Sequence, residues 1–401
     1  MKAPDVAGDA ARRGFFAEHF PDFWATVENH PYALLETHRI SSETASVLRS
    51  AARDAWQIFA RVLPVLQNLP DEQFAAIGIP EFARGIVRHS DAAAGPAVLA
   101  RFDIALTERG PKILELNAET PFLLWESHEI AGFVAERLGY ADPNGGARRT
   151  LLAALSRCLA GVPAGARIAV TALNTWREDW FTAAFIARML REAAGRDAAL
   201  VATSDLRVEG GSLRNAGGEA IDVLWRMYPL EHFCNDRGGR AFCELIERGR
   251  LRIVNPATAL LLQNKAALAL IWGLHEANSY FTVDEHACVE RLFLRSSLEP
   301  LRDVERYVRK PVLGREGNGV AIVAGGRETE ASPHATYAAQ PVLYQDFVEL
   351  PKIAYRHPVE GAREDFGVYT AFVAGGEVSA LCLRVGARIT DAWAHFLPLG
   401  L

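Results

Sequence analysis

Polar and apolar residues alternate along the stretch LARFDIALTERGPKILELN. This pattern predicts an antiparallel hairpin with its turn centred on Arg109, so that Asp103 lies opposite Glu115 and Arg101 lies opposite Asn117. Because side chains alternate along a strand, all four would project from one face. A bulge at the turn would shift this register by one residue. The opposite, core-facing set would be Phe102, Ile104, Leu106, Leu114 and Leu116.

The four polar residues suggest metal and phosphate chemistry. Two carboxylates opposed on paired strands repel each other unless a cation neutralises them. Carboxylate and amide oxygens suit Mg²⁺, which also keeps positions for phosphate oxygens. Arg101 could bind a phosphate or a developing oxyanion. The alternative is a polar, solvent-facing side of an edge hairpin in which Arg101 bridges the acids.

A second candidate lies in YVRKPVLGREGNGVAIV, where a strand carrying Lys310 leads into three closely spaced glycines, Gly314, Gly317 and Gly319. Glycines let backbone N–H groups approach a phosphate. Lys310 would add a point charge, and Arg315 could stabilise transferred negative charge. The loop fits neither a Walker A motif nor a dinucleotide fingerprint, because no helix follows it. An ordinary hairpin is the alternative.

Two further stretches have both a chemical and an ordinary interpretation. Lys265 lies in an apolar helix expected over residues 258–277, where a lysine normally extends to solvent. PVLYQDFVEL, residues 341–350, is predicted to be an apolar strand that runs into an acidic segment. Such a segment could hydrogen-bond an adenine edge through its backbone, or it could be a core strand.

The rest of the chain predicts a mixed α+β or α/β protein. Residues 1–95 have helical periodicity, and a helix is expected over 124–138. RIAVTAL, then WFTAAFIARMLREAAG, then AALVATSDL form a strand–helix–strand unit typical of a parallel layer. A small hairpin over 206–215 and the strand IDVLWRMY follow. From residue 304 onward the pattern is rich in strands.

Composition limits the classes of function. The chain has 401 residues, 50% of them hydrophobic, and a formal net charge of −6, which disfavours a nucleic-acid or anionic-membrane surface. No signal-peptide pattern is expected at the N-terminus, and the longest apolar helix is too short to span a bilayer. Five scattered cysteines indicate a reducing cytoplasm. His232, Cys234 and Cys243 lack metal-site spacing, so we expect ordinary packing there.

Considered together, several blocks resemble the glutathionylspermidine synthase family, whose synthetase part is an unusual member of the ATP-grasp superfamily. The resemblance extends from about residue 75 to the C-terminus and is nearest to single-domain bacterial relatives described as acid–amine ligases. The matching blocks are IPEFARGIVRHS, RFDIALTERGPKILELNAETP, REDW, LWRMYPLEHF, NPATALLLQNKAAL, YVRKPVLGREGNGVAIV, YQDFVELPKI and FVAGGEVSALCLRVGARIT.

The resemblance implies roles for the polar residues. Arg101 would stabilise the reacting acyl–phosphate centre, and Lys265 and Lys310 would contact the phosphates of ATP. Arg315 would lie in a mobile loop that closes over the γ-phosphate. The implied magnesium ligands are Asp103, Glu115 and Asn117. The implied nucleotide-binding loop and adenine pocket contain Gly314, Gly317, Gly319, Gln345, Phe347 and Val348.

The resemblance also implies residues that bind the two substrates, but the match is less complete there. Glu178 and Asp179 match an acidic pair that faces a cationic amine, and Arg384 matches an arginine near the acid substrate. Family members commonly carry an acidic residue soon after that arginine, where this chain has Val385 and Gly386. They also tend to carry a histidine near the end, where this chain finishes FLPLGL with Leu399. Spermidine specificity is therefore not expected to carry over directly.

The implied enzyme is an ATP- and Mg²⁺-dependent carboxylate–amine ligase that forms an amide through an acyl phosphate and produces ADP. Its substrates would be a glutathione-like peptide acid and a polyamine-like amine, and a homodimer is possible. The alternative is a nucleotide-binding protein of ATP-grasp fold with a regulatory or assembly role. The expected organisation is a helical region (1–98), the hairpin with its following helix (99–140), a preATP-grasp-like α/β domain (150–257) and an ATP-grasp nucleotide-binding region (258–401).

Overall fold

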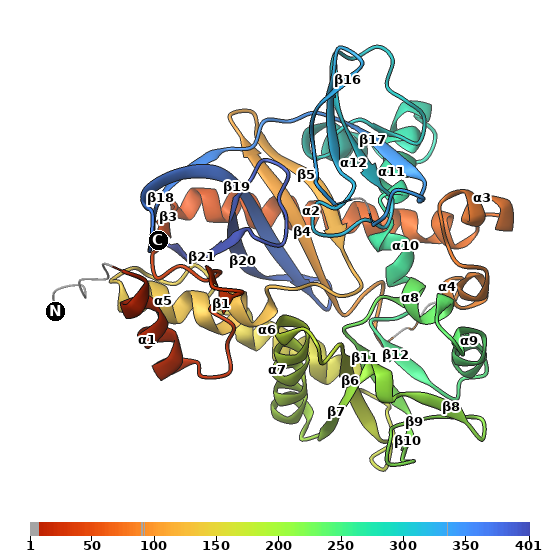
Figure 1. The fold of residues 1–401 in the computed structure, drawn as a ribbon. Coiled ribbons are helices and arrows are strands. Elements are labelled where there is room, and N and C mark those ends of the chain that lie inside the picture. Colours follow the sequence, from red (N-terminus) through yellow and green to blue (C-terminus); the bar gives the residue numbers. More distant parts are fainter. Residues whose placement is uncertain (1–7, 90, 92, 335) are drawn as a thin grey trace.

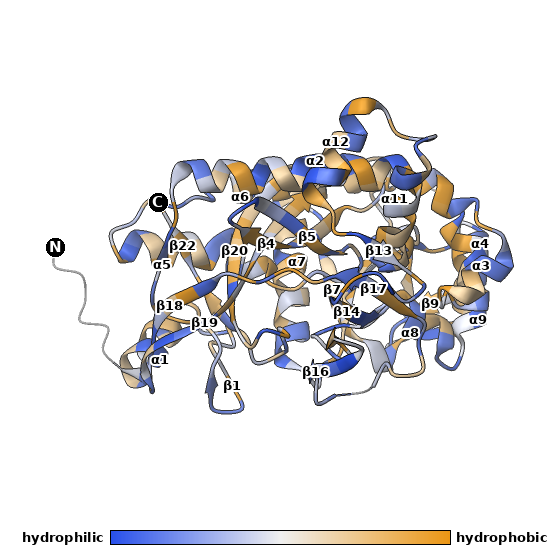
Figure 2. Cartoon of the chain, turned by 90° about the horizontal axis from the view of Figure 1, so that it is seen from above, coloured by the Kyte–Doolittle hydropathy of each residue, from blue (hydrophilic) through white to orange (hydrophobic). Residues whose placement is uncertain are grey.

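A computed structural model describes residues 8–401 except 90, 92 and 335. The first seven residues, which the sequence assigns to the helical N-terminal region, lie outside the described residues. The N-terminal part contains α1 (Asp9–His19) and the long α2 (Ser42–Gln67), followed by short helices α3 (Asp71–Ala76), η1 (Glu81–Ala83) and α4 (Arg84–Val87). Ser41 caps α2 by accepting a hydrogen bond from the Thr44 N–H. Both polar and apolar residues run along α2 (Figure 2), and its apolar face packs on the central sheet.

The central sheet joins distant parts of the chain (Figure 1). Its strand order is β21-β20-β19-β4-β5, with β18 also paired to β19. The hairpin strands β4 (Leu99–Thr107) and β5 (Gly110–Asn117) pair through β4 with the C-terminal strands. The ranges 99–140 and 258–401 therefore share one sheet. The other strands are β18 (Lys352–His357), β19 (Gly361–Ala374), β20 (Glu377–Gly386) and β21 (His395–Leu397).

The hairpin has the expected pairing at its polar end. Asp103 is paired with Glu115, and Arg101 with Asn117. The turn is tighter than predicted, because Thr107 pairs with Gly110, and a bulge after Asp103 restores the register. The bulge also corrects one core residue: Leu114 was expected on the core face but lines the polar pocket, while Ile113 is fully buried.

A parallel layer lies beside the central sheet, in order β12-β11-β6-β7. The predicted strand–helix–strand unit is present as β6 (Ile168–Ala172), α7 (Arg177–Ala194) and β7 (Ala198–Ala202), with Gly195 ending α7 at φ 61. Helix α6 (Ala147–Cys158) packs on both α7 and β20 and so joins the two sheets. The remaining elements are β8 (Arg207–Glu209), β9 (Ser212–Arg214), β10 (Ala220–Ile221), β11 (Val223–Arg226), α8 (Leu230–Asn235), α9 (Gly239–Glu247) and β12 (Arg252–Val254).

The third layer is an antiparallel sheet in order β13-β17-β14-β15-β16. The single helix expected over 258–277 is wrong, because the chain breaks at Asn264 and Lys265 between two helices. Asn264 Oδ1 accepts from the Ala266 N–H, and the Lys265 N–H donates to Val312 O. The elements are α10 (Ala259–Gln263), α11 (Ala266–Ala277), α12 (Val283–Leu292), β13 (Ser296–Ser297), β14 (Arg306–Pro311), β15 (Ala321–Ala324), β16 (Arg327–Ala331) and β17 (Val342–Asp346).

Short elements close the structure around the hairpin. The helix expected over 124–138 is present, with a π-helical turn η2 (Glu126–Ile130) before α5 (Ala131–Arg137). The last strand, β22 (Leu399–Gly400), pairs in parallel with β3 (His38–Arg39), which ties the C-terminus to the N-terminal region. The other elements are β1 (Thr26–Val27), β2 (His30–Pro31) and the 3₁₀ turn η3 (Thr203–Asp205).

Asn255 fastens the base of the hairpin to the parallel layer. Its buried amide donates to the carbonyls of Leu99, Ala118 and Glu119, and its Oδ1 accepts from the N–H groups of Val98 and Leu99. One side chain thus satisfies backbone groups at both ends of the hairpin, where water is excluded.

We expect Asn255→Ala to lower the free energy of unfolding by about 3 kcal/mol or more, because buried backbone groups lose their partners. Urea denaturation measures this. Asn68→Ala, which removes one exposed hydrogen bond to Pro64 O, is the matched control and should change stability by about 0.5 kcal/mol or less. Equal effects of the two substitutions would contradict the fastening role.

Candidate active site

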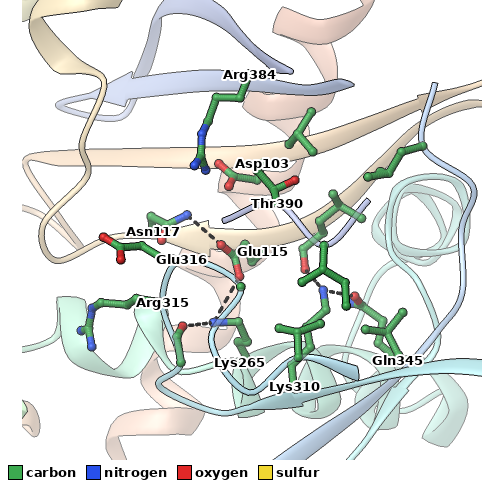
Figure 3. Close-up of a pocket in the computed structure, with 18 of the residues that line it drawn as sticks. Asp103, Glu115, Asn117, Lys265, Lys310, Arg315, Glu316, Gln345, Arg384 and Thr390 are labelled. Carbon is green, nitrogen blue, oxygen red and sulfur yellow. Dashed lines mark hydrogen bonds and ion pairs between the residues drawn. The ribbon is translucent and has the colours of Figure 1, made fainter. Parts of the chain in front are cut away.

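A pocket opens between the hairpin, the third sheet and the start of α7. Nearly all the catalytic, nucleotide-binding, substrate-binding and metal-binding residues predicted from the sequence line it, although they come from distant segments; Asp179 and Gly319 are the two that do not. Figure 3 shows Asp103 and Glu115 on the hairpin, Lys265 and Lys310 below them, and Arg384 on the opposite side. The fold therefore gathers the expected residues around one space.

Arg101 and Asp103 form a buried ion pair on the floor of the pocket. Nε and Nη2 of Arg101 lie 2.7 and 3.1 Å from the two oxygens of Asp103, and each residue is only 6% exposed. Arg101 Nη1 also donates to Phe122 O at 3.0 Å. The alternative of a solvent-facing polar side is wrong for Arg101 and Asp103, because both residues are buried, although β5 is the edge strand of the sheet. As that alternative expected, Arg101 pairs with an acid, namely Asp103, but the pair is bidentate and buried.

Glu115 is held by lysines from other parts of the chain. Its Oε2 lies 3.1 Å from Lys265 Nζ, and Asn117 Nδ2 donates to its Oε1 at 3.2 Å. Burial raises the pKa of Glu115, but the charges of Lys265 and Lys310 outweigh burial and lower it to about 2. Desolvation lowers the pKa of Lys310 to about 8, although Glu115 opposes that change. The site therefore holds closely spaced charges of both signs.

The two lysines are fixed by the third layer. Lys265 is 5% exposed and donates to Gly314 O at 2.7 Å, so the expectation that it extends to solvent is wrong. The helix break turns its side chain inward. Lys310 donates to Gln345 Oε1 at 2.8 Å and to Leu114 O at 3.3 Å. Both ammonium groups thus face the hairpin carboxylates across the pocket (Figure 3).

The glycine-rich loop after β14 forms one wall. Gly317 has φ 66, and a Cβ there would lie 2.5 Å from Thr390 O, so only glycine allows this approach. Arg315 points away from the two lysines (Figure 3) and pairs with the carboxylates of Glu119 and Glu231. Glu119 is also paired with Arg226 at 2.6 Å in the fully buried core. In this conformation Glu119 and Glu231 neutralise the charge of Arg315.

The end of the pocket beside β17 is apolar. Phe347 and Val348 line it together with Leu114 and Val368. Arg306 stacks over the Phe347 ring at 3.5 Å. Gln345, 1% exposed, donates to Ser296 Oγ and accepts from Lys310. A flat ring with polar edges fits such a slot.

The opposite end is acidic. Burial, and then the charges of Glu126, Asp179 and Glu316, raise the pKa of Glu178 to about 8. Burial and Glu316 raise the pKa of Asp179 to about 7. Neighbouring carboxylates repel each other, which disfavours their ionisation. A bound cation would relieve this repulsion, so this end of the pocket suits a cation.

Five residues around this pocket were not predicted from the sequence. Tyr32 lines it, and Glu126 lies behind Tyr32. Arg226 and Glu231 lie inside the matched block LWRMYPLEHF, and Glu119 inside the hairpin block, so those blocks held a signal for them. Tyr32 comes from an irregular segment with no pattern to mark it.

Other sites are not indicated. Among the described residues, no group of three or more His, Cys, Asp and Glu side chains could hold a metal ion, so the proposed magnesium set rests on two carboxylates and an amide. None of the helices in the described part of the chain is long and apolar enough to cross a membrane. All five cysteines are free thiols.

The fold of this chain is similar to that of one solved structure, and a family model matches its sequence. A solved structure of a glutathione synthetase-like effector from Globodera pallida covers 100% of this chain and 99% of its own, with a TM-score of 0.60 at 10% identity, which shows the fold alone. The chain belongs to the glutathionylspermidine synthase preATP-grasp family, whose model matches residues 16–401. The resemblance drawn from the sequence is thereby confirmed.

Named relatives agree with this membership. A protein of Haemophilus influenzae, named as a candidate acid–amine ligase, is 24% identical over 98% of this chain and 96% of its own length. The bifunctional glutathionylspermidine synthetase/amidase of Escherichia coli is 22% identical over 72% of this chain and 46% of its own. The trypanothione synthetase of Crithidia fasciculata is 26% identical over 70% of this chain and 45% of its own length. The chain spans about half the length of these last two. Its family is one of ligases, and the chain is an enzyme of that class.

We expect Arg101→Met to lower the free energy of unfolding by about 3 to 5 kcal/mol, because it leaves the buried Asp103 carboxylate without a cation. Adding Asp103→Asn should recover part of the loss by removing that charge. Urea denaturation of both variants, with Arg109→Met at the exposed hairpin turn as control, measures the effect. If the single substitution were as mild as the control, the ion pair would not be a buried structural contact.

Proposed function

We propose that this enzyme is an ATP-dependent carboxylate–amine ligase that forms an amide through an acyl phosphate. One observation carries the proposal: Lys265 and Lys310 line the same pocket as the opposed carboxylates of Asp103 and Glu115, beside a glycine-rich loop. Phosphoryl transfer needs mainly positioning and charge neutralisation, and such an arrangement supplies both.

In this proposal the nucleotide lies along the third sheet. Its adenine ring occupies the apolar slot of Phe347 and Val348 beside Gln345. Its phosphates extend toward Lys265 and Lys310, whose charges replace the water lost on binding. Gly314, Gly317 and Gly319 let the loop backbone pass close to the phosphates.

Asp103, Glu115 and Asn117 would hold Mg²⁺, because hard oxygen donors from adjacent strands are gathered on one face. The bound ion would screen the negative charge of the phosphates. The ion pair of Glu115 with Lys265 supports this assignment, because a cation already neutralises that carboxylate. Phosphates entering the site would offer Lys265 an alternative partner.

The chemical step uses two arginines. Arg101, fixed by Asp103 and Phe122 O, would face the oxygen of the acyl–phosphate carbonyl and stabilise charge there. Arg315 would stabilise the transferred phosphoryl group after exchanging Glu119 and Glu231 for it. The loop would exclude water from an intermediate that hydrolyses readily.

The substrates are proposed from chemistry and from the relatives. Glu178 and Asp179 would hold a polyamine-like cation, and Arg384 would bind a glutathione-like carboxylate. Val385 is fully buried, and a Cβ on Gly386 would lie 3.1 Å from Ala394 Cα. These two positions therefore add no acid to the pocket, so the amine can differ from spermidine. A homodimer stays a prediction, and the free thiols support a reducing cytoplasm.

The proposal is tested by incubating the chain with ATP, Mg²⁺, glutathione or a small-peptide pool, and a polyamine pool. We expect phosphate release that requires both an acid and an amine, and an amide detected by mass spectrometry. Glu115→Ala should reduce this turnover by about 100-fold or more. The exposed Glu72→Ala is the control and should match the wild type.

ATP binding without phosphate release or amide for any pool would overturn the proposal and favour a regulatory nucleotide-binding role. Normal turnover by Glu115→Ala would leave ligation in place and refute the magnesium assignment.

A further inference from the structure

A tyrosine and a buried glutamate form a pair that no step described above uses. Tyr32 follows β2 and lines the pocket. Its hydroxyl donates to Oε1 of Glu126 at 2.7 Å. The contact joins the N-terminal region to η2 across 94 residues. Tyr32 thus lies between the pocket and the carboxylate.

Glu126 is buried in a way that requires explanation. The residue is 0% exposed, and its second oxygen, Oε2, is buried without a hydrogen-bond partner among the described residues. An unsatisfied buried carboxylate oxygen is costly and is not expected in a purely structural role. Glu126 also begins a π-helical turn, a feature common at functional sites.

The pair lies beside the proposed reacting centre. Arg101, which we assign to the acyl group, donates to the carbonyl of Phe122, only four residues before Glu126 in the chain. Strand β20, which carries Arg384, packs against η2. Tyr32, Arg101, Glu178 and Arg384 line the same pocket.

We propose that Tyr32 and Glu126 form a proton relay that deprotonates the attacking amine. This inference rests on the proposed ligase function and supplies the base that the mechanism lacks. Tyr32 is the residue that touches the amine, and Glu126 accepts the proton through it.

The attacking ammonium loses two protons as the amide forms. The ammonium passes one proton to Tyr32 Oη while the hydroxyl proton of Tyr32 passes to Oε1 of Glu126. The freed nitrogen lone pair forms the C–N bond. The C–O bond to phosphate then breaks, and its electron pair leaves with the phosphate, which takes the second proton lost by nitrogen. The products are the amide, hydrogen phosphate and protonated Glu126, which later returns its proton to water.

The ionisation of both groups suits this role. Burial first, then the charges of Glu126 and Glu178, hold the pKa of Tyr32 well above its usual value, so it stays a neutral carrier. Burial raises the pKa of Glu126 to about 7, against the opposing hydrogen bond from Tyr32. A base is most effective when its pKa is near the working pH.

The charged and titratable groups around Glu126 come from four elements or segments. They are Tyr32 after β2, Glu178 on α7, Arg101 on β4, and Cys382 and Arg384 on β20. Glu178 has a pKa of about 8, near that of Glu126, and its neighbour Asp179 has a pKa of about 7. The rate of amide formation should rise as the pH increases through 7, because Glu126 then becomes a carboxylate. In the Glu126→Gln variant, this rise should be absent from the pH–rate profile.

Two nucleophiles separate the relay from the rest of the reaction. Hydroxylamine is uncharged at neutral pH and needs no base before it attacks an acyl phosphate, whereas spermidine and the polyamine pool are cationic. With ATP, Mg²⁺ and glutathione or the peptide pool, we expect Glu126→Gln and Tyr32→Phe each to reduce amide formation by about 100-fold. Hydroxamate formation should stay within about two-fold of wild type, and the double variant should lose no more than either single one.

Glu136→Gln on the exposed face of α5 and Tyr369→Phe, whose hydroxyl contacts His38, are matched controls that should behave as wild type. Equal loss with both nucleophiles, or no loss with either, would overturn the relay. If wild-type protein forms neither amide nor hydroxamate, the ligase function itself fails.

Discussion

Everything in this site depends on the pairing of Asp103 with Glu115 across the hairpin. Antiparallel geometry puts two carboxylates side by side on one face, and burial would force one of them to take up a proton. Arg101 neutralises the first, and Lys265 with Lys310 neutralises the second. The repulsion between two acids is thus the reason why cations from three separate segments converge here.

The fold brings these cations to the hairpin from separate elements. Lys310 comes from a strand of the third sheet, whereas Lys265 reaches the pocket only because the helix is interrupted beside it. Asn255 fixes the base of the hairpin. The same pocket leaves an apolar slot at one end and a cluster of acids at the other. This polarity matches a nucleotide on one side and a cationic amine on the other, with Arg101 between them.

Much of this was predictable from the sequence, because alternation reports the face of a strand directly. The pairing of Asp103 with Glu115 and the parallel layer were predicted correctly. The bulge that turns Leu114 into the pocket was not, since Ile113 and Leu114 are both apolar and alternation alone cannot tell which of them faces the core. The burial of Lys265 was missed because the Ala- and Leu-rich stretch hides a helix break. A tertiary hydrogen bond from the Lys265 N–H to Val312 O and a local one from the Ala266 N–H to Asn264 stabilise this break. Glu126, between apolar residues in FLLWESHEIAGF, gave a weak signal, but its partner Tyr32 is distant in sequence.

A crystal structure with Mg²⁺ and a non-hydrolysable ATP analogue tests the central claim most directly. The account predicts the metal between Asp103 and Glu115, the triphosphate against Lys265 and Lys310, and the Lys265–Glu115 ion pair exchanged for a phosphate contact. A nucleotide bound elsewhere, with that ion pair unchanged and no metal on the hairpin, would contradict it.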